Sequence, residues 1–530
     1  MKRNAVKALV LAGWLWLPTL AVLSTDNLQT GSEVAALLAF SLIVLAAPLV
    51  LLPRLRHYFL LWTPLALLVA PYCYLTVMYG SVPGDALLSA TLHTSPAMSL
   101  QVLASFGWRV WLAPASLLVY VWLAWSLDRD FKLGAPARKR LLAGLLTIVM
   151  LAMVARQALD QRVALPPLLE QSTADLAFPS GLALSLMRLS RHAVYSGDVA
   201  SVHGRALAAA PAPLLVVLVV GESLRADHLG INGYGRDTTP HLAALGPDLL
   251  SFPDVASTAN WTSRAVPGIV TLPVGRRQAN LLQTFHEAGY RTAWLSNQEP
   301  TSLSAAADVA EHAIDTQDFH LRTDVNLLPL FVSFVRQAGP REFVVLHMIG
   351  SHIPYEERYG AASKVYVPTL RDLGVGEPVL ADKAAAINSY DNTVVETDKF
   401  LARVIDVLRT ERRPAVLLYT SDHGENLFDN ERHLFMHAQP GPTHFDTHVP
   451  LLTWMNAPYR AAYPALEPAL RANRNKKISH ANVFSSVLQL GAVDWDGRDD
   501  SASFASPAYR ESPRMVVKDL SSSIRYDSLK

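Results

Sequence analysis

Acidic and imidazole side chains stand together directly after an apolar run at residues 414–422. The run ends in the stretch "SDHGE", which places Asp422 beside His423. Another apolar run, 213–221, is followed at once by Glu222. Two carboxylates and an imidazole form a mixed oxygen and nitrogen set that suits a zinc ion with one open position. Taken singly, Glu222 could be a helix N-terminal acid and Asp422 a turn residue, but their shared placement favours a metal.

Further histidines follow the other apolar runs. His352 lies just past the run 342–350, and the segment 432–450 contains four more: His433, His437, His444 and His448. Loop histidines ordinarily face solvent. We nevertheless expect one or two of them to enter the site as phosphate binders, acid catalysts or ligands of a second metal. Their spacing alone does not choose among them.

A metal alone does not define a reaction, because a nucleophile or a bound water is also needed. The segment 255–270 offers three hydroxyl side chains in a small, polar sequence that could open a helix: Thr258, Thr262 and Ser263. A hydroxyl at a helix N-terminus is most often a cap. A hydroxyl that also binds zinc has a lowered pKa and becomes an alkoxide nucleophile. The residues by themselves leave all three hydroxyls open.

Alternating strands and helices must position these side chains. Four apolar runs rich in Val, Leu and Ile are typical of fully buried strands: 213–221, 290–298, 342–350 and 414–422. Helical patterns lie between them, at 277–289 and 384–410. This alternation predicts a doubly wound α/β sheet in a domain of residues 211–530. Such sheets bind ligands at the carboxyl ends of their strands, where the candidate ligands are expected to meet.

The first 160 residues are far more apolar than the rest of a chain that is already 51% hydrophobic over 530 residues. Five segments are long enough for membrane-spanning helices: about 7–24, 34–52, 59–79, 110–127 and 141–159. Two of the four connections contain no Lys or Arg, namely 25–33 and 80–108. The positive-inside rule then predicts a cytoplasmic N-terminus and places the chain after residue 160 outside, which in a cell with two membranes is the periplasm.

Residues 161–210 are interpreted as linker helices between the membrane domain and the α/β domain. Within them, 176–196 has helical apolar spacing, with Arg188, Arg191 and His192 on the other side. This helix could lie flat at the membrane interface or pack on the soluble domain. The net charge of +1 gives no argument for nucleic acid. The single cysteine, Cys73, excludes an internal disulfide.

Several motifs, in order along the chain, resemble those of the bacterial inner-membrane phosphoethanolamine transferases. The matching stretches are "VVGESLRADHLGINGYGRDTTPHL", "HMIGSHIPY", "SYDNTVVETDKF" and "LLYTSDHGENL". These enzymes modify lipid A or the lipopolysaccharide core, and some confer resistance to colistin, a polymyxin. The resemblance implies a five-helix transmembrane domain followed by a periplasmic domain with the alkaline phosphatase/sulfatase fold.

The resemblance also implies roles for individual residues. Those that match the family's zinc ligands are Glu222, Asp422, His423 and Thr262, and Thr262 also matches its nucleophile. His352 and His437 match histidines expected near the transferred phosphate. Thr94 matches the threonine of a substrate loop at residues 85–101, and His444 is a further candidate for substrate binding. One zinc ion is expected, and a second is left open.

The implied reaction takes phosphoethanolamine from phosphatidylethanolamine, through a phosphothreonine, to lipid A, a lipopolysaccharide core sugar or a periplasmic glucan. The expected partners are therefore a lipid donor and an envelope glycolipid or glycan, and the protein is expected to be a monomer. Open alternatives are a membrane-anchored metal-dependent phosphatase or sulfatase-type hydrolase, a phosphoglycerol transferase and a non-catalytic sensor. The stretch "TSRAVP" (262–267) lacks the Cys/Ser-x-Pro-x-Arg pattern of sulfatases.

Overall fold

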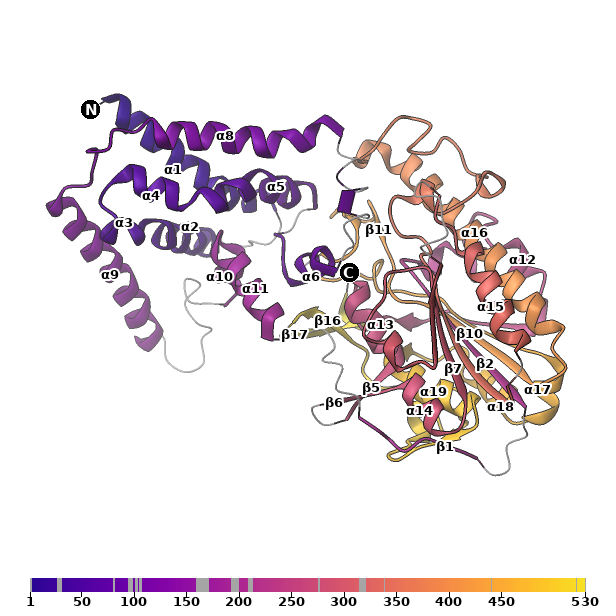
Figure 1. Cartoon of the computed structure of the whole chain (residues 1–530). Coiled ribbons are helices and arrows are strands. Elements are labelled where there is room, and N and C mark those ends of the chain that lie inside the picture. Colours follow the sequence, from indigo (N-terminus) through magenta and orange to yellow (C-terminus); the bar gives the residue numbers. More distant parts are fainter. Residues whose placement is uncertain are drawn as a thin grey trace. The chain divides into compact units, whose positions relative to one another are not determined.

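The computed structural model describes residues 2–25, 31–79, 82–93, 99–100, 103, 107–158, 171–191, 200–207, 213–274, 277–313, 321–337, 339–439, 441–520 and 522–529. These residues form two compact units, one drawn mainly from residues 1–192 and the other mainly from residues 193–530 (Figure 1). The first unit is helical and the second contains the large sheet.

The first unit consists of ten α-helices and one 3₁₀ helix within the described residues. They are α1 (Lys2–Val22), α2 (Gly31–Ala46), α3 (Pro48–Leu51), α4 (Leu55–Leu61), α5 (Thr63–Tyr79), α6 (Asp85–His93), η1 (Gly107–Trp111), α8 (Leu112–Trp125), α9 (Ala135–Ala158), α10 (Gln171–Leu176) and α11 (Ser180–Arg191). Two buried tyrosines of this unit donate their hydroxyls to backbone carbonyls. Tyr58 donates to the carbonyl of Leu45 at 2.6 Å, and Tyr120 donates to that of Phe59 at 2.9 Å.

Fewer helices qualify as membrane spans than the sequence predicts. Three helical stretches in the described part of the chain are long and apolar enough: Lys2–Val22, Glu33–Leu51 and Gly107–Trp125. A fourth is obtained if Leu55–Leu61 and Thr63–Val77 count as one span, although they are bent by 57° at their junction. The predicted segment 59–79 therefore begins inside a broken helix pair. The predicted segment 141–159 lies in α9 and runs past the described residues.

The amphipathic segment predicted at 176–196 forms α11 within the first unit. The preceding Ala177 and Phe178 are buried among side chains of α1, α2 and α5. Arg188 is not a free cation on a polar face. It makes two hydrogen bonds, of 2.7 and 2.8 Å, to the carboxylate of Asp85, and its third guanidinium nitrogen contacts Asp175 at 2.8 Å. The helix is thus fixed to the start of α6 by a charged cluster.

The second unit is built on one seven-stranded sheet, with strand order β3-β13-β10-β2-β9-β7-β8. The strands are β2 (Leu214–Gly221), β3 (Leu249–Phe252), β7 (Arg291–Ser296), β8 (Val309–His312), β9 (Arg341–His347), β10 (Ala415–Ser421) and β13 (Leu451–Met455). Those from β10 to β8 pair in parallel, whereas β13 and β3 are antiparallel additions. Every residue of β2 and β10 is buried, as expected for central strands covered on both faces.

Helices cover both faces of this sheet (Figure 1). On one face, Val216, Leu218 and Val220 pack with α13 (Thr262–Val270), α14 (Leu281–Glu287) and α19 (Val483–Leu490). On the other face, Leu215 and Val217 pack with α15 (Leu327–Arg336) and α16 (Lys383–Arg409). Alternate residues of one strand thus enter opposite cores. The doubly wound α/β fold predicted from the sequence is confirmed.

Shorter elements complete the second unit. Two-stranded pairs are formed by β1 (Arg205–Ala206) with β15 (Val493–Asp494), β4 (Val255–Ala256) with β14 (Ile478–Ser479), β5 (Thr271–Val274) with β6 (Arg277–Asn280), β11 (Asn426–Leu427) with β12 (Phe435–Met436), and β16 (Met515–Asp519) with β17 (Ser522–Arg525). The further short helices are α12 (Pro240–Ala243), α17 (Ala457–Ala462) and α18 (Leu466–Asn473). The helix predicted at 277–289 is in part wrong, because residues 277–280 pair as a strand with β5.

Candidate metal centre

The two central strands bring the candidate ligands to one edge of the sheet. β2 and β10 are parallel neighbours, with Gly221 opposite Ser421. The next residues, Glu222 and Asp422, therefore leave the sheet side by side, and His423 follows. All three side chains are fully buried. This is the carboxyl edge, where open α/β sheets bind their ligands.

Four side chains converge there. His423 Nε2 lies 3.3 Å from Glu222 Oε1 and 3.4 Å from Asp422 Oδ2. Thr262, the first residue of α13, donates its hydroxyl to Glu222 Oε2 at 3.1 Å, and the same hydroxyl lies 3.3 Å from His423 Nε2. The four residues that the sequence predicts as metal ligands are thus assembled from three separate segments.

The donor set of this cluster fits a metal ion. Asp422 Oδ1 accepts hydrogen bonds from the backbone amides of Ser223 and His423, but Asp422 Oδ2 is buried without a hydrogen-bond donor among the described residues. A buried carboxylate oxygen left in this state is costly unless a cation satisfies it. His423 Nδ1 lies 2.8 Å from the carbonyl of Gly424. That contact assigns the proton to Nδ1 and leaves the Nε2 lone pair directed at the carboxylates.

The charges of this cluster shift one another strongly. Burial and the neighbouring Glu222 carboxylate raise the pKa of Asp422. Burial lowers the pKa of His423, but the carboxylates of Asp422 and Glu222 outweigh burial and raise it. Two buried carboxylates therefore compete for positive charge, and a divalent cation would supply it in place of protons.

Two further predicted histidines lie at the same site. The ligand atoms of Glu222, His423 and His437 lie within 4.8 Å of one another. His437 Nδ1 is 3.1 Å from Glu425 Oε2, and the rings of His437 and His352 are 6.0 Å apart. Burial lowers the pKa of His352 to about 4 and that of His437 to about 3. Both imidazoles are therefore neutral at neutral pH, and the contact of His352 Nδ1 with the carbonyl of Ile353 at 2.6 Å assigns the proton of that ring to Nδ1.

Other predicted residues are placed elsewhere. His444 lies against the rings of Tyr526 and His448, at 5.3 and 4.9 Å, and His433 is exposed. Thr258, one of the three candidate nucleophiles, has a buried hydroxyl that abuts α13. Thr94 lies outside the described residues.

Sequence reasoning missed several residues that hold this centre. Gln298 donates to Glu222 Oε2 at 3.0 Å and to the carbonyl of Met348 at 2.6 Å. Gln298 lies two residues after the end of β7. This position after a predicted strand is the feature of the sequence that could have identified it. Ser257 Oγ donates to the carbonyl of Asp422 at 2.5 Å. Gly350 has φ of +46°, and a Cβ there would lie 2.6 Å from the carbonyl of Glu222, so a side chain would displace that ligand.

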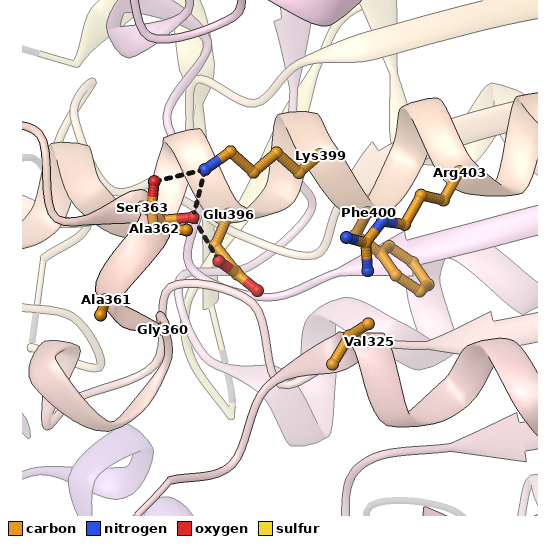
Figure 2. A pocket seen from close by; sticks show the side chains of 9 residues that line it. All are labelled: Val325, Gly360, Ala361, Ala362, Ser363, Glu396, Lys399, Phe400 and Arg403. Atoms are coloured by element: carbon orange, nitrogen blue, oxygen red, sulfur yellow. Dashed lines mark hydrogen bonds between the residues drawn. The ribbon is translucent and has the colours of Figure 1, made fainter.

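The pocket in Figure 2 is separate from this centre. This cavity of about 190 Å³ is lined by Val325, Gly360, Ala361, Ala362, Ser363, Glu396, Lys399, Phe400 and Arg403. The Lys399 ammonium group is already bound within its wall, to Ser363 Oγ at 3.0 Å and to the carbonyl of Ala362 at 2.6 Å. We assign this pocket no part in the chemistry.

Comparison with known proteins decides the family. A family model described as sulfatase matches residues 215–493, which is more than half of the chain. The chain belongs to the sulfatase family. It is 26% identical over 338 residues to phosphoethanolamine transferase EptC of Escherichia coli strain K12, a match that covers 60% of this chain and 58% of that protein. This sulfatase-family chain thus matches little more than half the length of that curated relative.

Solved structures show the same fold. The integral membrane protein lipooligosaccharide phosphoethanolamine transferase A from Neisseria meningitidis has a TM-score of 0.69 at 23% identity, covering 92% of this chain and 97% of that one. The periplasmic domain of EptC from Escherichia coli, solved in complex with Zn, has a TM-score of 0.55 at 24% identity, covering 62% of this chain and 97% of that domain. The likeness extends through both units.

Proposed function

We propose that this protein transfers phosphoethanolamine from phosphatidylethanolamine to a cell-envelope acceptor through a phosphothreonine at Thr262. The observation that carries the proposal is the position of the Thr262 hydroxyl, 3.1 Å from Glu222 and 3.3 Å from His423, at the N-terminus of α13. Relatives named as phosphoethanolamine transferases and the apolar helices of the first unit support it.

Four side chains would hold a zinc ion at this centre: Glu222, Thr262, Asp422 and His423. When bound, zinc lowers the pKa of a ligating hydroxyl and offsets negative charge on a phosphoryl group. The protein contributes the rest. Gln298 and Ser223 hold the Glu222 carboxylate from opposite oxygens, at 3.0 and 2.6 Å. His437 presents a neutral ring whose N–H can donate to a phosphoryl oxygen, and His352 lies beside it with its own Nδ1 proton bound to the carbonyl of Ile353.

The proposed reaction has two displacements at phosphorus. In the first, the Thr262 oxygen bonds to phosphorus while the bond to the diacylglycerol oxygen breaks; Thr262 loses its proton and diacylglycerol leaves as the alcohol. In the second, an acceptor oxygen bonds to phosphorus and Thr262 leaves with a proton restored. The candidate acceptors are lipid A, a lipopolysaccharide core sugar and a periplasmic glucan.

We also propose that the chain is a monomer of the bacterial inner membrane, with a cytoplasmic N-terminus and a periplasmic catalytic domain. The proposed boundaries are residues 1–160 for the membrane domain, 161–210 for the linker and 211–530 for the catalytic domain. The uneven distribution of Lys and Arg among the connecting loops supports this topology. Because the donor and its leaving group are lipids, an anchored domain meets them at the bilayer surface.

The test is the intact mass of the full-length protein after incubation with phosphatidylethanolamine. The wild type and a Ser263→Ala control should gain one phosphoethanolamine group, and Thr262→Ala should gain none. Free ethanolamine phosphate without an adduct would favour a hydrolase. An adduct formed only from phosphatidylglycerol would favour phosphoglycerol transfer. Neither adduct nor product from either lipid would overturn the proposal.

A further inference from the structure

The C-terminal hairpin lies beyond the residues that match the sulfatase family model, which end at 493. Strands β16 and β17 pair in antiparallel fashion, with Met515 opposite Arg525. The hairpin shares a small hydrophobic cluster with β4, formed by buried Val516, Tyr526 and Ala256. The hairpin therefore packs on the strand that leads toward Thr262.

A main-chain hydrogen bond links the hairpin to the nucleophile segment. The amide of Val517 donates to the carbonyl of Thr258 at 2.8 Å. Thr258 in turn touches α13 directly, since a Cβ built on Gly268 would lie 2.1 Å from Thr258 Oγ1. α13 begins at Thr262. Contact therefore runs without a gap from the hairpin, through Thr258, to the helix that presents the nucleophile.

Arg514 fastens the hairpin to the other end of the same segment. Its side chain is only 3% exposed and forms an ion pair with Asp254, the residue before β4, and a second with Asp527 at 2.6 Å. The guanidinium also lies 4.4 Å from the ring centre of Tyr526. A buried guanidinium that binds two carboxylates is strongly oriented. Arg514 thus ties both ends of the hairpin to Asp254.

The segment between Asp254 and α13 depends on hydrogen bonds from other parts of the chain, because its own backbone is irregular. Residues 257–261, between β4 and α13, belong to neither helix nor strand. Their amides and carbonyls are held from other parts of the chain: Ser257 by the carbonyl of Thr447, Asn260 by the amide of Ala438, and Thr258 by Val517. The hairpin supplies one of these three supports.

We propose that the C-terminal hairpin is a positioning element for the nucleophile, in which Arg514 and the Val517–Thr258 hydrogen bond hold Thr262 at its place beside Glu222. This inference rests on the proposed function of Thr262. The side-chain partners of Arg514 are Asp254, Asp527 and Tyr526, none of them a candidate metal ligand, so Arg514 acts through the segment 254–258. Displacements near 1 Å at a reacting group can cost about 100-fold in rate, so partial loss of this support should lower kcat measurably.

The test compares Arg514→Ala with Arg514→Lys, which keeps a cation, and with Lys518→Ala, which changes an exposed residue of β16. Full-length proteins are assayed for the initial rate of adduct formation at several phosphatidylethanolamine concentrations, and bound zinc is measured by elemental analysis. We expect Arg514→Ala to lower kcat about tenfold with unchanged KM and unchanged bound zinc. Arg514→Lys should recover part of the rate, and Lys518→Ala should match the wild type.

Hydrogen exchange of the peptide covering 255–265 gives a second readout that needs no donor lipid. Exchange there should rise in Arg514→Ala and not in Lys518→Ala. A folded Arg514→Ala with wild-type kcat and wild-type exchange would overturn the inference, as would loss of zinc in proportion to the rate. If Arg514→Ala does not fold, Asp527→Asn must show the same pattern, because it weakens the ion pairs of Asp527 with Arg514 and Lys477 and leaves the pair of Arg514 with Asp254 in place. A wild type without any adduct but with the expected exchange difference would count against the proposed function and leave the hairpin's role standing.

Discussion

A carboxylate oxygen without a hydrogen-bond donor is the clearest sign, at the scale of single residues, that the centre takes a cation. Asp422 Oδ2 is such an atom within the described structure, and it faces the ring of His423 at 3.4 Å. The Glu222 carboxylate, by contrast, is held by donors at both oxygens. A metal at this point would therefore complete the pairing of Asp422 while Glu222 stays oriented by the protein.

Replacing Gln298 by Ala should weaken zinc binding about tenfold, because residues that orient a metal ligand typically contribute that much to affinity. The substitution removes the side-chain amide that donates a hydrogen bond to Glu222 Oε2 at 3.0 Å. Competition with a chromogenic chelator measures the affinity. Gln283→Ala is the matched control, since Gln283 contacts Glu287 on α14 and lies away from the centre. Equal affinities of the two variants would show that Gln298 does not orient Glu222.

Replacing Glu377 by Gln should stabilise the protein at pH 8 and not at pH 4.5. Burial raises the pKa of Glu377 from 4.5 to about 7. The folded state therefore binds more protons than the unfolded state between these values, and stability falls as the pH rises through that range. For this half-buried group we expect a gain of about 1 kcal/mol at pH 8 after solvent screening. The measurement is the melting temperature of the wild type and of Glu377→Gln at both pH values, with the exposed Glu431→Gln as control.

At the scale of elements, the strands of the second unit could be predicted because their local sequence decides them. Unbroken apolar runs produced β2, β7, β9 and β10 with ends within a few residues of the prediction. The helix predicted at 277–289 failed in its first turn, because residues 277–280 pair with β5, a tertiary contact that a local pattern does not carry. The choice among Thr258, Thr262 and Ser263 stayed open for the same reason: it depends on distances to segments far away in the sequence.

The charged cluster between α6 and α11 should behave as a buried ion pair. Arg188→Ala leaves Asp85, whose side chain is 1% exposed, without its bidentate partner, and should destabilise the first unit by about 3 kcal/mol. The double variant Arg188→Ala/Asp85→Ala should be destabilised less than Arg188→Ala alone, because the buried carboxylate is removed together with the guanidinium that binds it. Thermal unfolding of the four proteins in one detergent gives the double-mutant cycle. Additive losses would argue against a direct interaction.

At the scale of the whole molecule, the second unit holds its own two large hydrophobic clusters and the complete sheet. Residues 200–530 expressed alone should therefore fold, unfold cooperatively and bind zinc. Their transfer from phosphatidylethanolamine in vesicles should fall at least about 100-fold relative to the full chain, because tethering supplies a high effective concentration of donor. Transfer rates from vesicles and from a short-chain soluble donor separate the two effects. Equal vesicle rates for both proteins would mean that the membrane unit does not deliver the lipid.

The hairpin of β16 and β17 also has a consequence for the timing of biosynthesis. β4 and α13 leave the ribosome long before residues 514–527, and chains grow at roughly 5–20 residues per second while domains fold. The central sheet can therefore assemble, and the metal-ligand side chains that follow β2 and β10 can meet, before the backbone around Thr258 is held by Val517 and Arg514. A newly made domain would hold its metal before it becomes a competent catalyst. Incomplete chains would then leave membrane lipids untouched.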